Sequence, residues 1–173
     1  MIGGIIDFRF FLEENIPEIV VQKFQSYIGK SAIPPFWSFG YHQSRWGYKN
    51  ITYLQNVTSS FHKYNLPLDT IWSDIDYMLN YEDFTIDETK FPLNEMKDLI
   101  KNVHYIPIMD AGILIGNSTF YTEGQKRGVF IKDANGSEYW GKMRPGRTTF
   151  VDFLHPNASK YWSDMLDILH NKV

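Results

Sequence analysis

Short apolar runs alternate with segments of helical periodicity along most of this chain. Strand-like runs cover Leu68–Asp74 and His104–Asp110, and Phe36–His42 (FWSFGYH) has the composition of a buried strand. Segments with apolar residues at helical spacing lie between these runs. The order strand, helix, strand, helix, strand is typical of parallel βαβ units. The pattern therefore predicts an α/β fold with a parallel sheet.

The predicted helices have start and stop signals. An early helix begins at Asn15-Ile16-Pro17 and ends at Gly29, because Asn caps a helix, Pro suits its first turn and Gly ends it. A further strand is expected before it, at Gly4–Phe11. The apolar faces of the later helices are Leu54, Val57, Phe61 and Tyr64, then Leu93, Met96, Leu99, Ile100 and Val103, and finally Tyr161, Trp162, Met165, Leu166 and Leu169.

A long excursion, residues 111–150, separates the third strand from the last helix, which opens at Pro156. The Asn135-Gly136 pair is a turn signal, and it is flanked by Val129–Lys132 and Tyr139–Lys142, so a hairpin is predicted here. A connection of this length is usually functional.

Two of the predicted strands deliver carboxylates at their ends. Asp74 ends the run that starts at Leu68, and Asp110 ends the run that starts at His104. In a parallel α/β barrel the C-terminal ends of the strands open onto the active-site face. Asp74 and Asp110 therefore indicate a site for a polar, hydroxyl-rich ligand.

Composition excludes several other classes. The chain has 173 residues, is 43% hydrophobic and 17% aromatic, and can build a core. Its formal charge is -3 and it has no block of Lys and Arg, so nucleic acid is not an expected partner. No apolar run approaches the roughly 20 residues of a membrane helix. It has no cysteine, no metal-ligand spacing and no phosphate-binding glycine loop, so we expect no metal and no cofactor.

Glycosylation acceptors are more frequent than chance predicts. Eleven Asn and twenty Ser and Thr residues predict about one N-x-S/T site, and the chain has five, at Asn50, Asn56, Asn117, Asn135 and Asn157. The excess favours a secretory-pathway, lysosomal or extracellular protein. The alternative is local structure, since Asn135-Gly136 is also a turn signal and Asn157 lies at a helix start.

Several ordered motifs resemble those of glycoside hydrolase family 31, the retaining α-glucosidases. The resemblance covers nearly the whole chain, and its motifs are Gly3–Phe8 (GGIIDF), Ile33–Trp37 (IPPFW), Gly40–Tyr48 (GYHQSRWGY), Leu68–Met78 (LDTIWSDIDYM) with Asp83–Thr85 (DFT), Gly128–Lys132 (GVFIK), Gly141–Gly146 (GKMRPG) and Asp152–Phe153.

The resemblance implies the first part of a (β/α)8 barrel, about three βα units long. Residues 1–30 would be the end of an N-terminal β-sandwich and a connecting helix, and residues 31–173 would be barrel with the insertion at 111–150. Retaining glycosidases use one carboxylate as nucleophile and another as acid and base. In the family both follow the third strand's loop, so the resemblance implies no catalytic residue in this chain. The remaining half of the barrel would be its partner.

The resemblance also assigns the carboxylates. Asp74 and Asp110 match the family's sugar-contacting Asp residues, and carboxylates suit pairs of sugar hydroxyls. In the family a Pro usually follows the Asp that matches Asp110, and in this chain Ala111 takes that position. Asp76 is interpreted as structural, for example as an ion-pair partner of Arg45.

Arg144 is the sharpest departure from the family, which has a Trp that lines the glucose site at this position. A guanidinium can cover a sugar face but is charged and hydrogen-bonds directionally. Arg144 is therefore a candidate substrate contact that indicates either an altered, even anionic, substrate or a lost function.

Aromatic and histidine residues complete the candidate set. His42, Arg45 and Trp46 are expected to be structural and to brace the barrel floor and the loop after the second strand. Trp72 is a further candidate sugar contact, whereas Trp37 and Trp162 are expected to pack in the core.

Three hypotheses about function follow. The first is a fragment of an α-glucosidase that releases terminal α-linked glucose from an oligosaccharide. The second is a truncated, non-catalytic form that at most binds sugar. The third, motivated by Arg144, is a family member with altered glycoside specificity.

Overall fold

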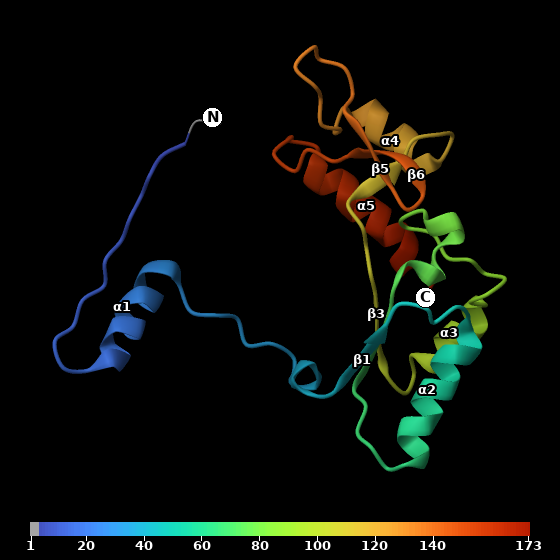
Figure 1. The fold of residues 1–173 in the computed structure, drawn as a ribbon, viewed down its shortest axis with the longest axis horizontal. Helices are drawn as coiled ribbons and strands as arrows, with labels where there is room; N and C mark the ends of the chain where they lie inside the picture. The colour runs from blue at the N-terminus through green and yellow to red at the C-terminus, as the bar shows by residue number, and fades with distance from the viewer. Residues whose placement is uncertain (1–3) are drawn as a thin grey trace. The chain divides into compact units, whose positions relative to one another are not determined.

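The computed structural model describes residues 4–173 and divides into two units, of which the first ends at Pro35 and the second is Phe36–Val173 (Figure 1). The prediction for Gly3 lies outside the described residues. Among residues 4–35 the regular element is helix α1, Pro17–Ile28, which ends at Gly29 with φ 90°. Its N-cap is Ile16, so the expected Asn15 cap is wrong.

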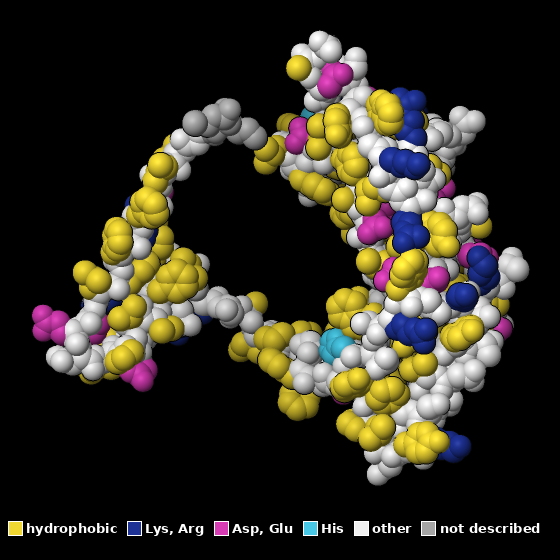
Figure 2. Space-filling view, viewed as in Figure 1, with side chains coloured by type: hydrophobic (Ala, Val, Ile, Leu, Met, Phe, Trp, Pro, Cys, Tyr) yellow, Lys and Arg dark blue, Asp and Glu magenta, His cyan; other side chains and the backbone are white. Residues whose placement is uncertain are grey.

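The strand expected at Gly4–Phe11 is also wrong. These residues pair with no strand in the described part of the chain, and side chains such as Ile5 are almost fully exposed at 95%. Phe11 is held to α1 by ring contacts with Phe24 and Tyr27 (centroids 5.5 and 5.9 Å apart). No residue of α1 is buried, and Figure 2 shows hydrophobic side chains along the surface of this unit. Alternation alone cannot stabilise a strand whose hydrogen bonds have no partner strand.

The second unit contains the predicted parallel sheet, in the order β1-β2-β3. Its strands are β1 (His42–Arg45), β2 (Thr70–Ser73) and β3 (His104–Pro107). The register aligns His42 with Thr70 and Thr70 with His104. The parallel βαβ order is confirmed, and the described strands form an open, partial barrel wall.

The first strand begins later than predicted. Phe36–Phe39 form a 3₁₀ turn, η1, and β1 starts only at His42. One local and one long-range bond hold the turn: the Gly40 N–H donates to the Trp37 carbonyl, and the Asp69 carboxylate accepts from the Tyr41 N–H at 3.1 Å. A Cβ at Gly40 would fall on that same carboxylate, so the turn needs glycine.

Helices cover one face of this sheet. They are α2 (Ile51–Lys63), α3 (Leu93–Leu99) and the C-terminal part of α5 (Ala158–His170), with α2 and α3 adjacent (Figure 1). The Asn50 side chain caps α2 by accepting from the Tyr53 N–H. Buried residues of this core include Leu54, Ile71, Tyr77, Phe91, Met96 and Leu169.

The excursion after β3 folds into a second, antiparallel sheet with its own helix. Its strands are β4 (Gly112–Leu114), β5 (Trp140–Met143) and β6 (Gly146–Phe150) in the order β4-β6-β5, and its helix is α4 (Thr119–Arg127). Phe130, Val151 and Met165 belong to a core that joins this sheet to α5. The insertion is thus a packed subdomain.

The predicted hairpin is only partly present. The turn at Asn135-Gly136 forms, with the Asp133 N–H donating to the Ser137 carbonyl at 2.7 Å, but its arms share an isolated bridge, Lys132 with Glu138. The main ladder is instead β5 with β6, around Arg144-Pro145.

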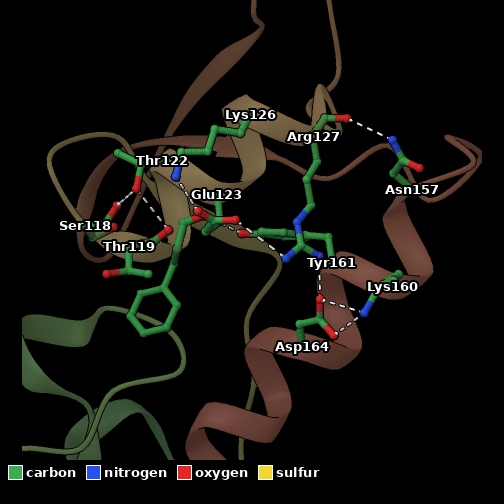
Figure 3. A network of polar contacts seen from close by, with 11 residues as sticks. Ser118, Thr119, Thr122, Glu123, Lys126, Arg127, Asn157, Lys160, Tyr161 and Asp164 are labelled. Carbon is green, nitrogen blue, oxygen red and sulfur yellow. Dashed lines mark hydrogen bonds and ion pairs between the residues drawn. The ribbon is translucent and has the colours of Figure 1, made fainter.

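Polar contacts join α4 to α5 (Figure 3). The Arg127 guanidinium pairs with Asp164 at 2.6 Å and with Glu123 at 3.6 Å, and Lys160 also binds Asp164. The pKa of Asp164 is lowered, mainly by the hydrogen bond from the Arg127 guanidinium and then by the one from Lys160. These side chains are partly exposed, so the network contributes modestly to stability. Within residues 4–173 no helix combines the length and apolar character needed to cross a bilayer.

Candidate functional site

Asp74 and Asp110 lie at the same end of the parallel sheet. Ser73 and Pro107 are aligned as the last residues of β2 and β3, and the Ile108 N–H continues the ladder by donating to the Ser73 carbonyl at 2.9 Å. Asp74 follows β2 directly, and Asp110 follows β3 by three residues. Both carboxylates therefore emerge at the rim formed by the C-terminal ends of the strands.

The Asp74 side chain has both a local role and a free acceptor. Its Oδ1 accepts from the Ile75 N–H at 2.8 Å and caps the 3₁₀ turn η2 (Ile75–Tyr77). Its Oδ2 accepts no hydrogen bond from residues 4–173. The side chain is half-buried. One oxygen thus orients the carboxylate while the other can accept from a sugar hydroxyl.

The Asp110 side chain is half-buried, and within the described residues its carboxylate has neither an ion-pair partner nor a hydrogen-bond donor. Its backbone is anchored instead, because the Asp110 N–H donates to Asp83 Oδ1 at 2.9 Å. An anchored main chain that carries an unpaired carboxylate suits the binding of hydroxyl groups.

Asp76 braces the rim, but with a different partner from the one predicted. The expected ion pair with Arg45 does not form between these described residues, and Asp76 Oδ2 accepts from the Gly47 N–H at 2.8 Å. Gly47 has a φ of 104°, a backbone conformation that favours glycine and turns its N–H toward Asp76. The bond joins the loop after β1 to the segment after β2.

Arg144 comes to this rim from the insertion. It lies between β5 and β6, and its guanidinium carbon stands 4.5 Å from the ring centroid of Trp46, in the loop after β1. The Trp46 side chain is half exposed, at 56%. The stack brings two predicted residues from distant parts of the chain together, and a cation above an indole face is attracted to its π-electrons.

His42 and Trp72 contact each other on the sheet face opposite Ile71 and Ser73. The Trp72 indole N–H donates to His42 Nδ1 at 3.0 Å, and His42 Nε2 lies 3.4 Å from Thr70 Oγ1. Trp37 stacks on His104 from the neighbouring strand with centroids 4.1 Å apart. The Trp72 indole nitrogen is therefore already in use, so this ring offers mainly its face to a ligand.

Sequence reasoning assigned no role to two buried side chains behind the rim. The Tyr77 hydroxyl donates to the Ile108 carbonyl at 2.8 Å, and Asp83 binds the Asp110 main chain. Burial raises the pKa of Asp83 to about 7 and raises the pKa of Tyr77. The signal available in the sequence was the motif Asp83–Thr85, which places an acidic residue next to an aromatic one.

The glycosylation candidates differ in their surroundings. Asn56, Asn117, Asn135 and Asn157 are exposed, whereas Asn50 is half-buried at its cap. The Asn157 amide nitrogen, the atom that would carry a glycan, donates to the Arg127 carbonyl at 3.3 Å (Figure 3). Asn117 and Asn135 have exposed side chains outside helices, the setting typical of modified acceptors.

Two hollows that the described residues line lie away from the rim. One, of 610 Å³, lies among α3, β3 and α5, and the other, of 640 Å³, between α2 and α3. Neither is lined by Asp74 or Asp110. Because the described sheet is open, the rim is identified by its carboxylates and not by an enclosed volume.

Comparison with known proteins agrees with the partial parallel barrel described above. Residues 31–173 match the model of the glycosyl hydrolases family 31 TIM-barrel domain. The chain is 39% identical over 185 residues to glucoamylase 1 of Candida albicans, with 99% of this chain and 20% of that protein covered. It is 37% identical to the lysosomal acid alpha-glucosidase of Tetrahymena pyriformis, with coverage of 96% and 18%. The chain thus spans about a fifth of the length of these relatives.

Solved structures resemble the fold as well. The glucosidase II alpha subunit bound to DNJ superposes with a TM-score of 0.81 at 28% identity, over 88% of this chain and 17% of that one. A family 31 alpha-glucosidase from Bacteroides thetaiotaomicron gives 0.77 at 29% identity, over 91% and 28%. With the parallel sheet, the acidic rim and the matched model in agreement, the chain belongs to glycoside hydrolase family 31 and contributes part of that family's TIM barrel.

Proposed function

We propose that the protein containing this chain is an α-glucosidase that releases terminal α-linked glucose from oligosaccharides. The observation that carries the proposal is the rim at two adjacent strand ends. There, Asp74 Oδ2 and the Asp110 carboxylate have no hydrogen-bond donor among the described residues. A carboxylate that accepts from two hydroxyls orients a sugar ring and selects its configuration. The names of the relatives support the same substrate class.

In this proposal the chain binds and orients glucose, and the reacting carboxylates belong to a later part of the barrel. A retaining glycosidase needs two carboxyl groups about 5 Å apart on opposite sides of the scissile bond. Asp74 and Asp76 do not suit that task, because each has an oxygen committed to a backbone N–H. By resemblance to family 31, we propose that the nucleophile and the acid/base lie outside residues 1–173.

The test is hydrolysis by the full-length protein that carries this sequence. It is expected to release glucose from maltose and nitrophenol from p-nitrophenyl α-D-glucopyranoside, while the 173-residue chain alone is expected to show no turnover. Absence of sugar release from every α-glycoside tried would refute the assignment. Turnover by the 173-residue chain would refute the placement of the catalytic pair.

A secretory or lysosomal location is proposed from the five acceptors, four of which are exposed. Relatives with such locations include the lysosomal enzyme and an endoplasmic reticulum glucosidase II. An endoglycosidase is expected to lower the apparent mass of the natural protein, and an unchanged mass would contradict this proposal.

The contact between Arg144 and Trp46 favours a second candidate, an enzyme for an acidic α-glycoside. Arg144→Trp removes the cation, so it is expected to lower any preference for a glucuronide over a glucoside by about tenfold, the effect of one charge-assisted hydrogen bond. The measurement is the ratio of kcat/KM for the two p-nitrophenyl glycosides. Arg147→Trp, which replaces the guanidinium stacked on Trp140, is the matched control. An unchanged ratio in Arg144→Trp would remove this candidate.

A further inference from the structure

The short segment that leads from β3 to Asp110 is held by side chains from the segment after β2. The Tyr77 hydroxyl donates to the Ile108 carbonyl at 2.8 Å, and Asp83 Oδ1 accepts from the Asp110 N–H at 2.9 Å. The Ile108 N–H is itself bound to the Ser73 carbonyl. The main chain of Asp110 is thus fixed by the neighbouring strand exit, and its carboxylate extends from that fixed point.

Asp83 is placed by the core. Its side chain is only 2% exposed, and its Oδ2 is buried without a hydrogen-bond partner among the described residues. The next residue, Phe84, is 1% exposed and packs edge-on against Trp162 with centroids 5.1 Å apart. Phe84 has a φ of 63°, which is uncommon for a bulky residue and indicates a backbone held by its surroundings.

The groups that face Asp83 add negative charge or apolar surface. They are Glu82 beside it, Tyr77 from η2, Asp110 beyond β3 and Tyr161 from α5, and none of these four is a cation. Burial is the main cause that raises the pKa of Asp83 to about 7, and the Asp110 N–H opposes it. Above that pH, an ionised Asp83 places a second negative charge beside Asp110.

We propose that Asp83 is a positioning residue for the sugar-binding rim, which fixes the Asp110 main chain and thereby sets where the Asp110 carboxylate meets the sugar. The inference rests on the proposed function. Asp83 touches no sugar and acts only through Asp110. Its ionisation repels the Asp110 carboxylate, so sugar binding weakens as the pH rises.

Two variants of the full-length protein separate position from charge. Asp83→Asn keeps an acceptor oxygen and removes the charge, whereas Asp83→Leu removes both at similar volume. With p-nitrophenyl α-D-glucopyranoside, Asp83→Leu is expected to raise KM about tenfold over the parent below pH 7, where Asp83 is uncharged, which is the effect of one lost hydrogen bond to the rim. Asp83→Asn is expected to keep the parent's KM in acid and to lose the parent's rise in KM above about pH 7.

Amide hydrogen exchange at Asp110 is the second readout, and it needs no sugar. Exchange is expected to be about tenfold faster in Asp83→Leu than in the parent and to be restored in Asp83→Asn, because only a bound N–H is protected. If Asp83→Leu fails to fold, the pH profile of KM in Asp83→Asn against the parent still decides the matter.

The results that would refute the role of Asp83 differ from the result that would refute the proposed α-glucosidase function. Exchange at Asp110 that is equal in folded Asp83→Leu and the parent would overturn it, and so would the same KM profile in Asp83→Asn and the parent. A parent that hydrolyses no α-glucoside would refute the proposed function, and exchange would still test whether Asp83 holds Asp110.

Discussion

Replacing Asp74 with alanine is expected to lower kcat/KM for p-nitrophenyl α-D-glucopyranoside by about 100-fold in the full-length protein. The free Oδ2 of Asp74 has two lone pairs and can accept from two sugar hydroxyls, and both hydrogen bonds, each contributing about 1.5 kcal/mol or more, are lost. Steady-state kinetics measures the loss. Asp74→Asn retains the cap on the Ile75 N–H and so separates sugar binding from local folding.

The matched control is an aspartate on the outer surface. Asp98→Ala removes a carboxylate whose side chain is 71% exposed and whose partner is Lys101 on the same surface. Such pairs contribute little to stability, so activity is expected to remain unchanged. Equal kcat/KM in the Asp74→Ala and Asp98→Ala proteins would contradict the role of Asp74 in the rim.

Replacing Asp83 with asparagine is expected to stabilise the protein in mild alkali and to leave it nearly unchanged in acid. The pKa of Asp83 is raised in the folded state to about 7, above its unfolded value. Its contribution to the unfolding free energy is therefore fully present below about pH 4 and is lost as the pH rises through 7. The difference between variant and parent reaches at most about 4 kcal/mol near pH 8.

Denaturant unfolding of both proteins at several pH values measures this difference. Asp164→Asn is a control with the opposite sign, because Arg127 lowers the pKa of Asp164 and its contribution is lost as the pH falls. Parallel stability curves for Asp83→Asn and the parent would show that the Asp83 carboxyl is ionised at neutral pH.

Local sequence patterns predicted the parallel sheet well but predicted poorly where its strands begin and end. Apolar runs separated by helical spacing specify βαβ order, and β1, β2 and β3 follow it. The run Phe36–His42 is equally apolar, but Phe36–Phe39 form η1 and the strand starts only at His42, because the Asp69 carboxylate binds the chain at Tyr41 beside the turn at Gly40. That bond spans two segments, so no property of the run itself could reveal it.

In the insertion, too, the sequence pattern predicted some features and missed others. Helix α4 was not predicted, since its sequence TFYTEGQKR is largely polar and gives a weak apolar period. Its end signals were present, because Ser118 caps its start and Gly128, with a φ of 67°, ends it. The opposite error occurred at Gly4–Phe11, where a strand-like pattern has no partner strand.

By itself, the sequence determined the family, the parallel order of the sheet and the shared rim of Asp74 and Asp110. These follow from local order, because strands that run parallel bring all their C-terminal ends to one side. Tertiary structure alone decided that Asp83 holds Asp110, that Gly47 binds Asp76 and that Arg144 stacks on Trp46. Such contacts join residues far apart in the chain, and they depend on how packed cores orient loops, which no periodicity along the sequence records.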